Sequence, residues 1–292
     1  MRCAFSTLGV PGMPVDEVVR LAVETGFDGV ELRTHPEEPV RPGLAPRAQE
    51  EVREQFAAAG VHLLAVAGYA RVAAALDEKG EEELAAELTD LVELAAGLGA
   101  PYVRVFPGGG DRPAPEADAD AARRLGALAP YAAERGVRVL LETHDSHRRG
   151  ADVARVLGLV GHRSVGALWD VLHPWLGGEE PAATHAALAP YLGYVQVKDV
   201  ASAEDTTPLA LGAGALPLAD CLDAVRRSGG AGWVCWEYEK RWYPDAAALP
   251  DLLAEGRAYL GRLLANAPAN GPDAVTGPDA ATAPFRDLSD RP

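Results

Sequence analysis

Cysteine is scarce in this sequence: the 292 residues include only Cys3, Cys221 and Cys235. These three lack Cys-x-x-Cys spacing, and two of them lie in apolar, strand-like runs, so we expect reduced core residues. The chain also has no run of about 18 apolar residues, which argues against a membrane-spanning helix. Its N-terminus lacks the basic segment, apolar stretch and cleavage site of a secretory leader. We therefore predict a cytoplasmic protein.

Positive charge is in short supply as well. The chain contains 27 lysines and arginines against 43 aspartates and glutamates, and its formal net charge is −16. Affinity for nucleic acid comes largely from basic residues that release counterions from phosphates, so this charge argues against a nucleic-acid partner. We also expect no membrane partner. A homodimer, the commonest assembly, or a partner subunit is compatible with the sequence.

What the sequence does contain is a regular alternation of short β-branched runs and amphipathic stretches as far as residue 265, which is typical of a parallel sheet covered by helices. Eight strands are predicted, at Arg2–Ser6, Gly29–Leu32, Val61–Ala67, Tyr102–Phe106, Arg138–Glu142, Val165–Asp170, Tyr194–Lys198 and Trp233–Glu237. Helices are predicted at roughly 14–25, 46–59, 81–98, 116–135, 150–160, 181–189, 217–228 and 246–265. Glycines such as Gly26 and Gly60 end the helices as left-handed stops.

Eight such units in one chain fit a closed (β/α)₈ TIM barrel of the α/β class better than an open doubly wound sheet. The first turn, residues 6–12, also lacks the GxGxxG pattern of a dinucleotide site. We assign residues 1–265 to one barrel domain. Residues 266–292 lose the periodicity and are rich in alanine, proline and aspartate, so we expect a disordered tail without a catalytic role.

Active sites of TIM barrels lie at the carboxyl ends of the strands, and four consecutive predicted strands carry polar side chains there. Glu142, Asp170 and Glu237 close the fifth, sixth and eighth strands, and Gln196 lies in the seventh. Any single acid is better explained as a helix cap or the partner of an arginine. Three converging carboxylates, however, would raise one another's pKa unless a cation offset their charge. We therefore predict one divalent metal ion, held by all four side chains.

At these residues the sequence resembles the xylose-isomerase-like barrels, in the branch of sugar phosphate isomerases and epimerases. The resemblance covers about residues 1–265 and includes the segments Phe5–Gly9, Gly26–Leu32, Asp170–His173 and Val197–Asp199. It implies that the same four side chains are the metal ligands. It also implies that His173 contacts the substrate, where it hydrogen-bonds a hydroxyl group or shuttles its proton.

Gln196 departs from many members of this family, which have histidine at the fourth ligand position. The glutamine leaves a site with oxygen donors alone, which suits Mn²⁺ or Mg²⁺ and weakens the preference for Zn²⁺ or Co²⁺, the alternatives. Glutamine at this position also occurs among dehydroshikimate dehydratase-like lyases of the same superfamily. A dehydratase therefore stays open as a second interpretation.

Other side chains near the strand ends are candidates for contact with substrate. They are His144, Lys198, Tyr69, Arg71, Arg104 and Trp175. A solvated loop position is an equal alternative for His144, and Lys198 has pairing with Asp199 as its alternative. An aromatic side chain such as Trp175 can stack on the face of a sugar.

The predicted chemistry is isomerisation or epimerisation of a sugar or related polyhydroxy-carbonyl compound. The metal would stabilise the enediolate that forms when a carbon-bound proton leaves. Glu142 and Glu237 would remove and return that proton, with His173 as a third catalytic residue. The alternative is a lyase on the same scaffold, which is dehydroshikimate or inosose dehydratase-like or cleaves a C-glycoside. An abasic-site endonuclease is disfavoured, because the third and fourth strands end without the histidines that its zinc cluster requires.

Overall fold

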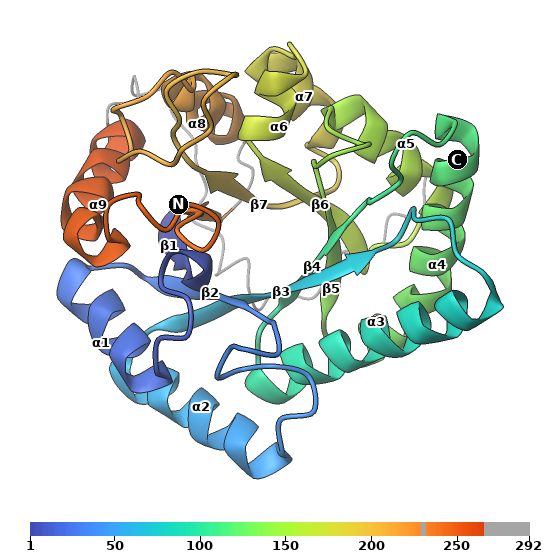
Figure 1. Ribbon diagram of the computed structural model, residues 1–292, viewed down its shortest axis with the longest axis horizontal. Helices are drawn as coiled ribbons and strands as arrows, with labels where there is room; N and C mark the ends of the chain where they lie inside the picture. Colours follow the sequence, from blue (N-terminus) through green and yellow to red (C-terminus); the bar gives the residue numbers. More distant parts are fainter. Residues whose placement is uncertain (229–231, 266–292) are drawn as a thin grey trace, which may run out of the picture.

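The barrel is closed. The computed structural model describes residues 1–228 and 232–265, and its eight parallel strands pair in the order β1 to β8, with β8 returning to β1. Figure 1 shows the strands in the centre and the helices in a ring around them. The predicted TIM barrel is thus confirmed. The predicted tail, 266–292, lies outside the described residues.

The sequence placed the elements to within a few residues. The strands are β1 (Arg2–Ser6), β2 (Gly29–Arg33), β3 (His62–Arg71), β4 (Tyr102–Phe106), β5 (Arg138–Glu142), β6 (Val165–Asp170), β7 (Leu192–Val197) and β8 (Trp233–Trp236). The helices are α1 (Val15–Thr25), α2 (Pro46–Ala59), α3 (Glu78–Leu98), α4 (Ala114–Glu134), α5 (Gly150–Val160), α6 (Leu172–Leu176), α7 (Pro181–Leu188), α8 (Leu218–Arg227) and α9 (Leu249–Ala265). A 3₁₀ turn, Thr7–Gly9, and α6 were not expected.

Two apolar layers follow from the period of two along each strand. In β6, Ala167 and Trp169 belong to the large core between strands and helices, whereas Leu168 belongs to a small cluster inside the barrel. Each strand is therefore buried on both faces, as parallel strands usually are. The inward face is the one that continues into the polar residues at the barrel mouth.

Glycine ends α1 and α2 as the sequence predicts. Gly26 and Gly60 have φ angles of 72° and 69°, in the left-handed region. A side chain in that conformation would be strained, so these glycines stop each helix and turn the chain into the next strand.

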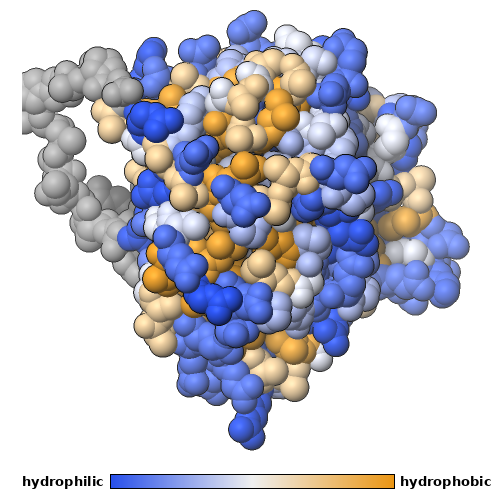
Figure 2. All heavy atoms as spheres, turned by 60° about the vertical axis from the view of Figure 1, so that its left-hand side comes forward, coloured by the Kyte–Doolittle hydropathy of each residue, from blue (hydrophilic) through white to orange (hydrophobic). Residues whose placement is uncertain are grey.

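The outer surface mixes polar and apolar residues, as Figure 2 shows for one face. Large exposed hydrophobic side chains come from separate parts of the chain, such as Val23 in α1 and Leu159 in α5. Within the described ranges, no helix combines the length and the apolar character needed to cross a membrane.

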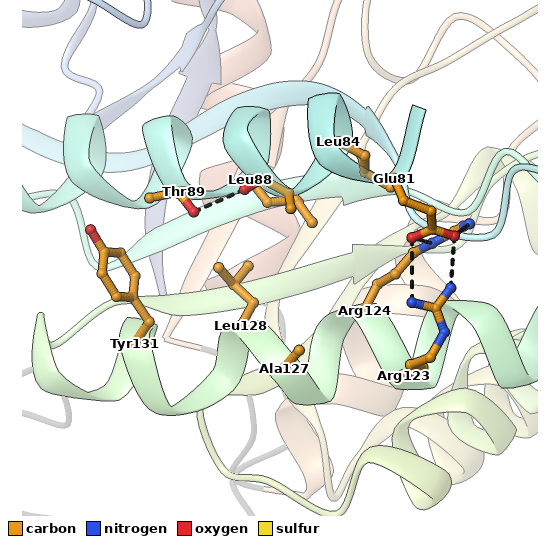
Figure 3. Close-up of a pocket in the computed structure, with 10 residues that line it drawn as sticks. Glu81, Leu84, Leu88, Thr89, Arg123, Arg124, Ala127, Leu128 and Tyr131 are labelled. Carbon is orange, nitrogen blue, oxygen red and sulfur yellow. Dashed lines mark hydrogen bonds and ion pairs between the residues drawn. The ribbon is translucent and has the colours of Figure 1, made fainter. Parts of the chain in front are cut away.

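A groove of about 310 Å³ lies between α3 and α4, in the outer helical layer (Figure 3). At one end of it, the Glu81 carboxylate accepts hydrogen bonds from Arg123 Nη2 at 2.7 Å and Arg124 Nε at 3.1 Å. The bonds from Arg124 and Arg123 lower the pKa of Glu81 to about 2. Glu81 therefore ties the two helices together as an ion.

We expect Glu81→Gln to lower the free energy of unfolding at pH 7 by up to about 1 kcal/mol, the range of partly exposed ion pairs. A lowered folded-state pKa gives stability that is complete above the unfolded value and is lost as the pH falls towards 2. The difference between variant and wild type should therefore shrink between pH 4.5 and 2 in urea titrations. Glu83→Gln, an exposed change on the same helix, is the control, and a pH-independent difference for Glu81→Gln would contradict this account.

Candidate active site

The inward faces of the strands become polar at the barrel mouth. Leu140 and Leu168 belong to the apolar cluster inside the barrel, and Glu142 and Asp170 lie two residues further along the same strands. Residues two apart in a strand share a face, so both carboxylates point inward. Asp170 lies directly opposite Gln196 in the β6–β7 register. The fourth predicted ligand, Glu237, directly follows β8, and all four side chains are buried.

Lys198 lies buried among these acids. Its Nζ is 2.7 Å from Asp170 Oδ2 and 2.8 Å from Glu239 Oε1, and it also donates to Glu237. Burial acts to lower the pKa of Lys198, but the surrounding carboxylates outweigh it and raise the pKa well above its usual value. Pairing with Asp199, the alternative from the sequence, does not occur, because Asp199 accepts backbone hydrogen bonds from the following loop.

Arg104 lies between the two glutamates. Its Nε is 3.3 Å from Glu142 Oε2, and its Nη2 is 3.9 Å from Glu237 Oε1. The guanidinium carbon also lies 4.1 Å from the ring centre of Phe106 and 5.5 Å from that of Tyr69. This buried cation therefore brings together two carboxylates from different strands.

The pKa values of the two glutamates are shifted in opposite directions. Burial raises the pKa of Glu142 well above its usual value, and the charge of Arg104 offsets this only in part. Burial also acts on Glu237, but there Lys198 and Arg104 outweigh it and lower the pKa. Two carboxyl groups whose pKa values are pushed apart are suited to act as an acid and a base.

Sequence reasoning missed Glu31, a fully buried acid in β2. Its carboxylate accepts a hydrogen bond from the Tyr194 hydroxyl, and Gln196 Nε2 lies 2.9 Å from both of its oxygens. Only the amide nitrogen of a glutamine can donate to a carboxylate, so this contact fixes the orientation of Gln196 and leaves its Oε1 without a partner. The available signal was that Glu31 lies between two buried apolar residues, Val30 and Leu32.

The donor atoms present fit a divalent cation. Gln196 Oε1 is buried and accepts no hydrogen bond within the described ranges, whereas the buried oxygens Asp170 Oδ2 and Glu142 Oε2 lie 2.7 Å from Lys198 Nζ and 3.3 Å from Arg104 Nε, respectively. Four buried carboxyl groups, those of Glu31 and the three predicted acidic ligands, lie near the two buried cations Arg104 and Lys198. Ionisation of all four would need more positive charge than these two cations supply, and a bound metal ion would supply it. Oxygen donors of this kind are the ligands of hard cations.

Two histidines lie beside Glu142. His173, in α6, has its ring centre 4.1 Å from that of His144, which follows β5. Ligand atoms of Glu142, His144 and His173 all lie within 4.8 Å of one another, and among the described residues no other three acids, histidines or cysteines do so. The three carboxylates predicted as ligands thus are not within that distance of each other, because Arg104 and Lys198 lie between them.

The other residues predicted to contact the substrate, Tyr69, Arg71 and Trp175, lie in different environments. The Tyr69 hydroxyl accepts a hydrogen bond from Arg33 Nε at 2.6 Å, and its ring packs near Arg104, so Tyr69 belongs to the site. Arg71 is exposed at the end of β3, where its side chain lies beside Gly108. Trp175 is partly buried and packs on the hydrophobic core.

The fold agrees with a comparison against known families. Residues 19–263 match a family described as the xylose isomerase-like TIM barrel. The chain belongs to this family. A curated relative in Streptomyces coelicolor, a putative hydroxypyruvate isomerase, is 34% identical over 108 residues. That match covers 37% of each protein, so most of the relative's length lies outside it.

Solved structures of the xylose isomerase-like barrel family share the architecture. D-psicose 3-epimerase from Clostridium cellulolyticum H10 superposes with a TM-score of 0.78 at 15% identity, covering 90% of this chain and 99% of its own. A probable 3-DHS dehydratase from Bacillus anthracis gives 0.75 at 19% identity, over 89% and 99%. The IOLI protein with a bound zinc atom gives 0.78 at 20%, over 90% and 98%. At these identities the likeness is one of fold.

Proposed function

We propose that this family member is a divalent-metal-dependent isomerase or epimerase of a sugar or related polyhydroxy-carbonyl compound. The observation that carries the proposal is the group of buried oxygens on Glu142, Asp170, Gln196 and Glu237 at the barrel mouth, among which Gln196 Oε1 accepts no hydrogen bond within the described residues. Together with Glu237 these residues would hold Mn²⁺ or Mg²⁺, which prefer oxygen donors. A bound ion of this kind polarises substrate oxygens as a Lewis acid.

The chain's own residues supply the proton chemistry. Glu142 and Glu237 lie on either side of the Arg104 guanidinium, so one can take a carbon-bound proton and the other can return one from a different side. Arg104 and Lys198 are fixed positive charges next to this pair and stabilise negative charge on a substrate oxygen. His173 lies beside Glu142, in position to hydrogen-bond a substrate hydroxyl group.

Proton exchange tests this proposal most directly. Ketoses, inososes, dehydroshikimate and hydroxypyruvate would be incubated with the protein and Mn²⁺ in deuterated water and followed by NMR. We expect at least one compound to lose a single carbon-bound proton signal. The expected partner is a small molecule, in keeping with the net charge of −16. Binding of a compound without any exchange would indicate a binding module and contradict the proposal.

Gln196 favours a lyase as the second candidate, since glutamine at this ligand position also occurs among dehydroshikimate dehydratase-like lyases of the same superfamily. The first step, removal of a carbon-bound proton, is common to both reactions. A lyase then expels a β-hydroxyl group as water instead of reprotonating the carbon. A new ultraviolet band from a conjugated product, with dehydroshikimate or an inosose as substrate, would identify this outcome.

Lys198 provides a further test of the metal site, because its ammonium contacts two of the four proposed ligands. We expect Lys198→Met to bind Mn²⁺ at least about tenfold more tightly. A unit charge at about 4 Å corresponds to roughly 4 kcal/mol at the protein surface, well above the 1.4 kcal/mol per tenfold change in affinity. Titration of the metal-free proteins by Mn²⁺ electron paramagnetic resonance measures this. Lys79→Met, an exposed change, is the control, and an equal or weaker affinity of Lys198→Met would refute competition by the lysine.

A further inference from the structure

The turn after β5 is held rigidly. The backbone N–H of His147 donates to the carbonyl of His144 at 2.8 Å, and the reverse bond is 3.3 Å long. Between them, Asp145 has a φ of 31°, the sole positive value at a non-glycine residue in the described ranges. Such backbone strain persists where surrounding contacts fix it, and it is concentrated at functional sites. The proposed proton chemistry makes no use of this turn.

Asp145 orients the ring of His144. Its Oδ2 lies 3.1 Å from His144 Nδ1, and its carboxylate also accepts hydrogen bonds from the backbone N–H groups of Gly108 and Ser146. An ionised carboxylate can only accept, so His144 Nδ1 carries a proton, and Nε2 is the ring nitrogen left to bind a ligand. A carboxylate on the far nitrogen is the usual support of a metal-binding histidine.

His173 is the second histidine beside Glu142. Within the described ranges, neither of its ring nitrogens forms a hydrogen bond to another residue. Its ring lies against that of His144, with 4.1 Å between the centres. The Glu142 carboxylate, whose Oε2 also lies 3.3 Å from Arg104 Nε, completes a group whose ligand atoms lie within 4.8 Å of one another.

We propose that Glu142, His144 and His173 form a second divalent-cation site, which shares Glu142 with the oxygen-rich site of the proposed function. Two nitrogens and one carboxylate oxygen suit Zn²⁺ or Co²⁺, whereas the first site suits Mn²⁺ or Mg²⁺. A carboxylate has two oxygens and can bridge two ions. The second ion would lie on the β5–β6 side of the barrel mouth, where it would bind a further substrate oxygen.

Nitrogen NMR of histidine-labelled, metal-free protein titrated with Zn²⁺ tests this site without reference to activity. Of the seven histidines, we expect the ring nitrogens of two to shift into the metal-bound range. His144→Gln and His173→Gln should each abolish the change, and His62→Gln, an exposed change at the start of β3, should retain it. Asp145→Asn, which tolerates the left-handed backbone, should weaken Zn²⁺ binding by about 10- to 100-fold.

The result separates this site from the proposed function. Histidine shifts in a protein that neither binds Mn²⁺ nor exchanges a substrate proton would support the second site and refute the proposed function. Zn²⁺ binding without a shift at His144 and His173 would overturn the second site, even if exchange with Mn²⁺ occurred. A shift that survived in both glutamine variants would overturn it as well.

Discussion

Replacing Glu142 with glutamine should slow exchange of the substrate's carbon-bound proton by about 10²- to 10⁴-fold, the usual contribution of a positioned acid or base. Glutamine keeps the size of the side chain and an oxygen for a metal, so some metal binding should survive. The loss should therefore come from proton transfer. The measurement is the rate of deuterium incorporation by NMR, with Mn²⁺ and substrate both saturating.

The control for this variant is Glu50→Gln, which removes an exposed glutamate that pairs with Arg53 on the surface. It should exchange the substrate proton at the wild-type rate. If Glu142→Gln also exchanged at that rate, Glu142 would not be the acid or base. Proton transfer would then depend on Glu237 and another group, for which His173 is the nearest candidate.

Arg104→Met should lower the free energy of unfolding by about 3–5 kcal/mol, the usual cost of removing one member of a buried ion pair. The variant would leave Glu142 and Glu237 buried without the cation that lies between them. Urea unfolding monitored by circular dichroism measures the loss. Arg47→Met, whose arginine pairs only at the surface with Glu51, should change stability by less than about 0.5 kcal/mol.

Added Mn²⁺ should restore part of the stability that Arg104→Met loses. A metal ion that binds only the folded protein shifts the unfolding equilibrium towards the native state, and it would supply positive charge to the same carboxylates. A stability loss below about 1 kcal/mol without metal would mean that the two glutamates do not depend on this arginine. A full loss that Mn²⁺ left unchanged would argue against a metal among them.

The regular part of the fold was predictable because it depends on local pattern. Strands β1, β4, β5 and β6 have the predicted bounds, since each is a short, mostly apolar run with clear ends. Helix α6 was missed because five residues are too few to show a helical period. It begins where Asp170 Oδ1 accepts a hydrogen bond from the backbone of Leu172, at 2.8 Å.

The candidate site was predictable only in part. Glu142 and Asp170 were found because an acid at the end of a buried strand is conspicuous in a sequence. Glu31 was missed because its partners, Tyr194 and Gln196, come from the opposite side of the barrel and are more than 160 residues away. No spacing in a sequence encodes such a contact, nor the place of Lys198 between acids from different strands.

The seam between β1 and β8 joins residues 2–5 to residues 233–236, near the two ends of the described chain. Glu237 is the next residue after that seam. A shortened chain that ended before residue 233 would keep Glu142 and Asp170 but would have nothing opposite them across Arg104. On the proposed function, turnover would therefore require a closed barrel. A partly folded protein with all its helices formed but with β8 unpaired from β1 would be inactive.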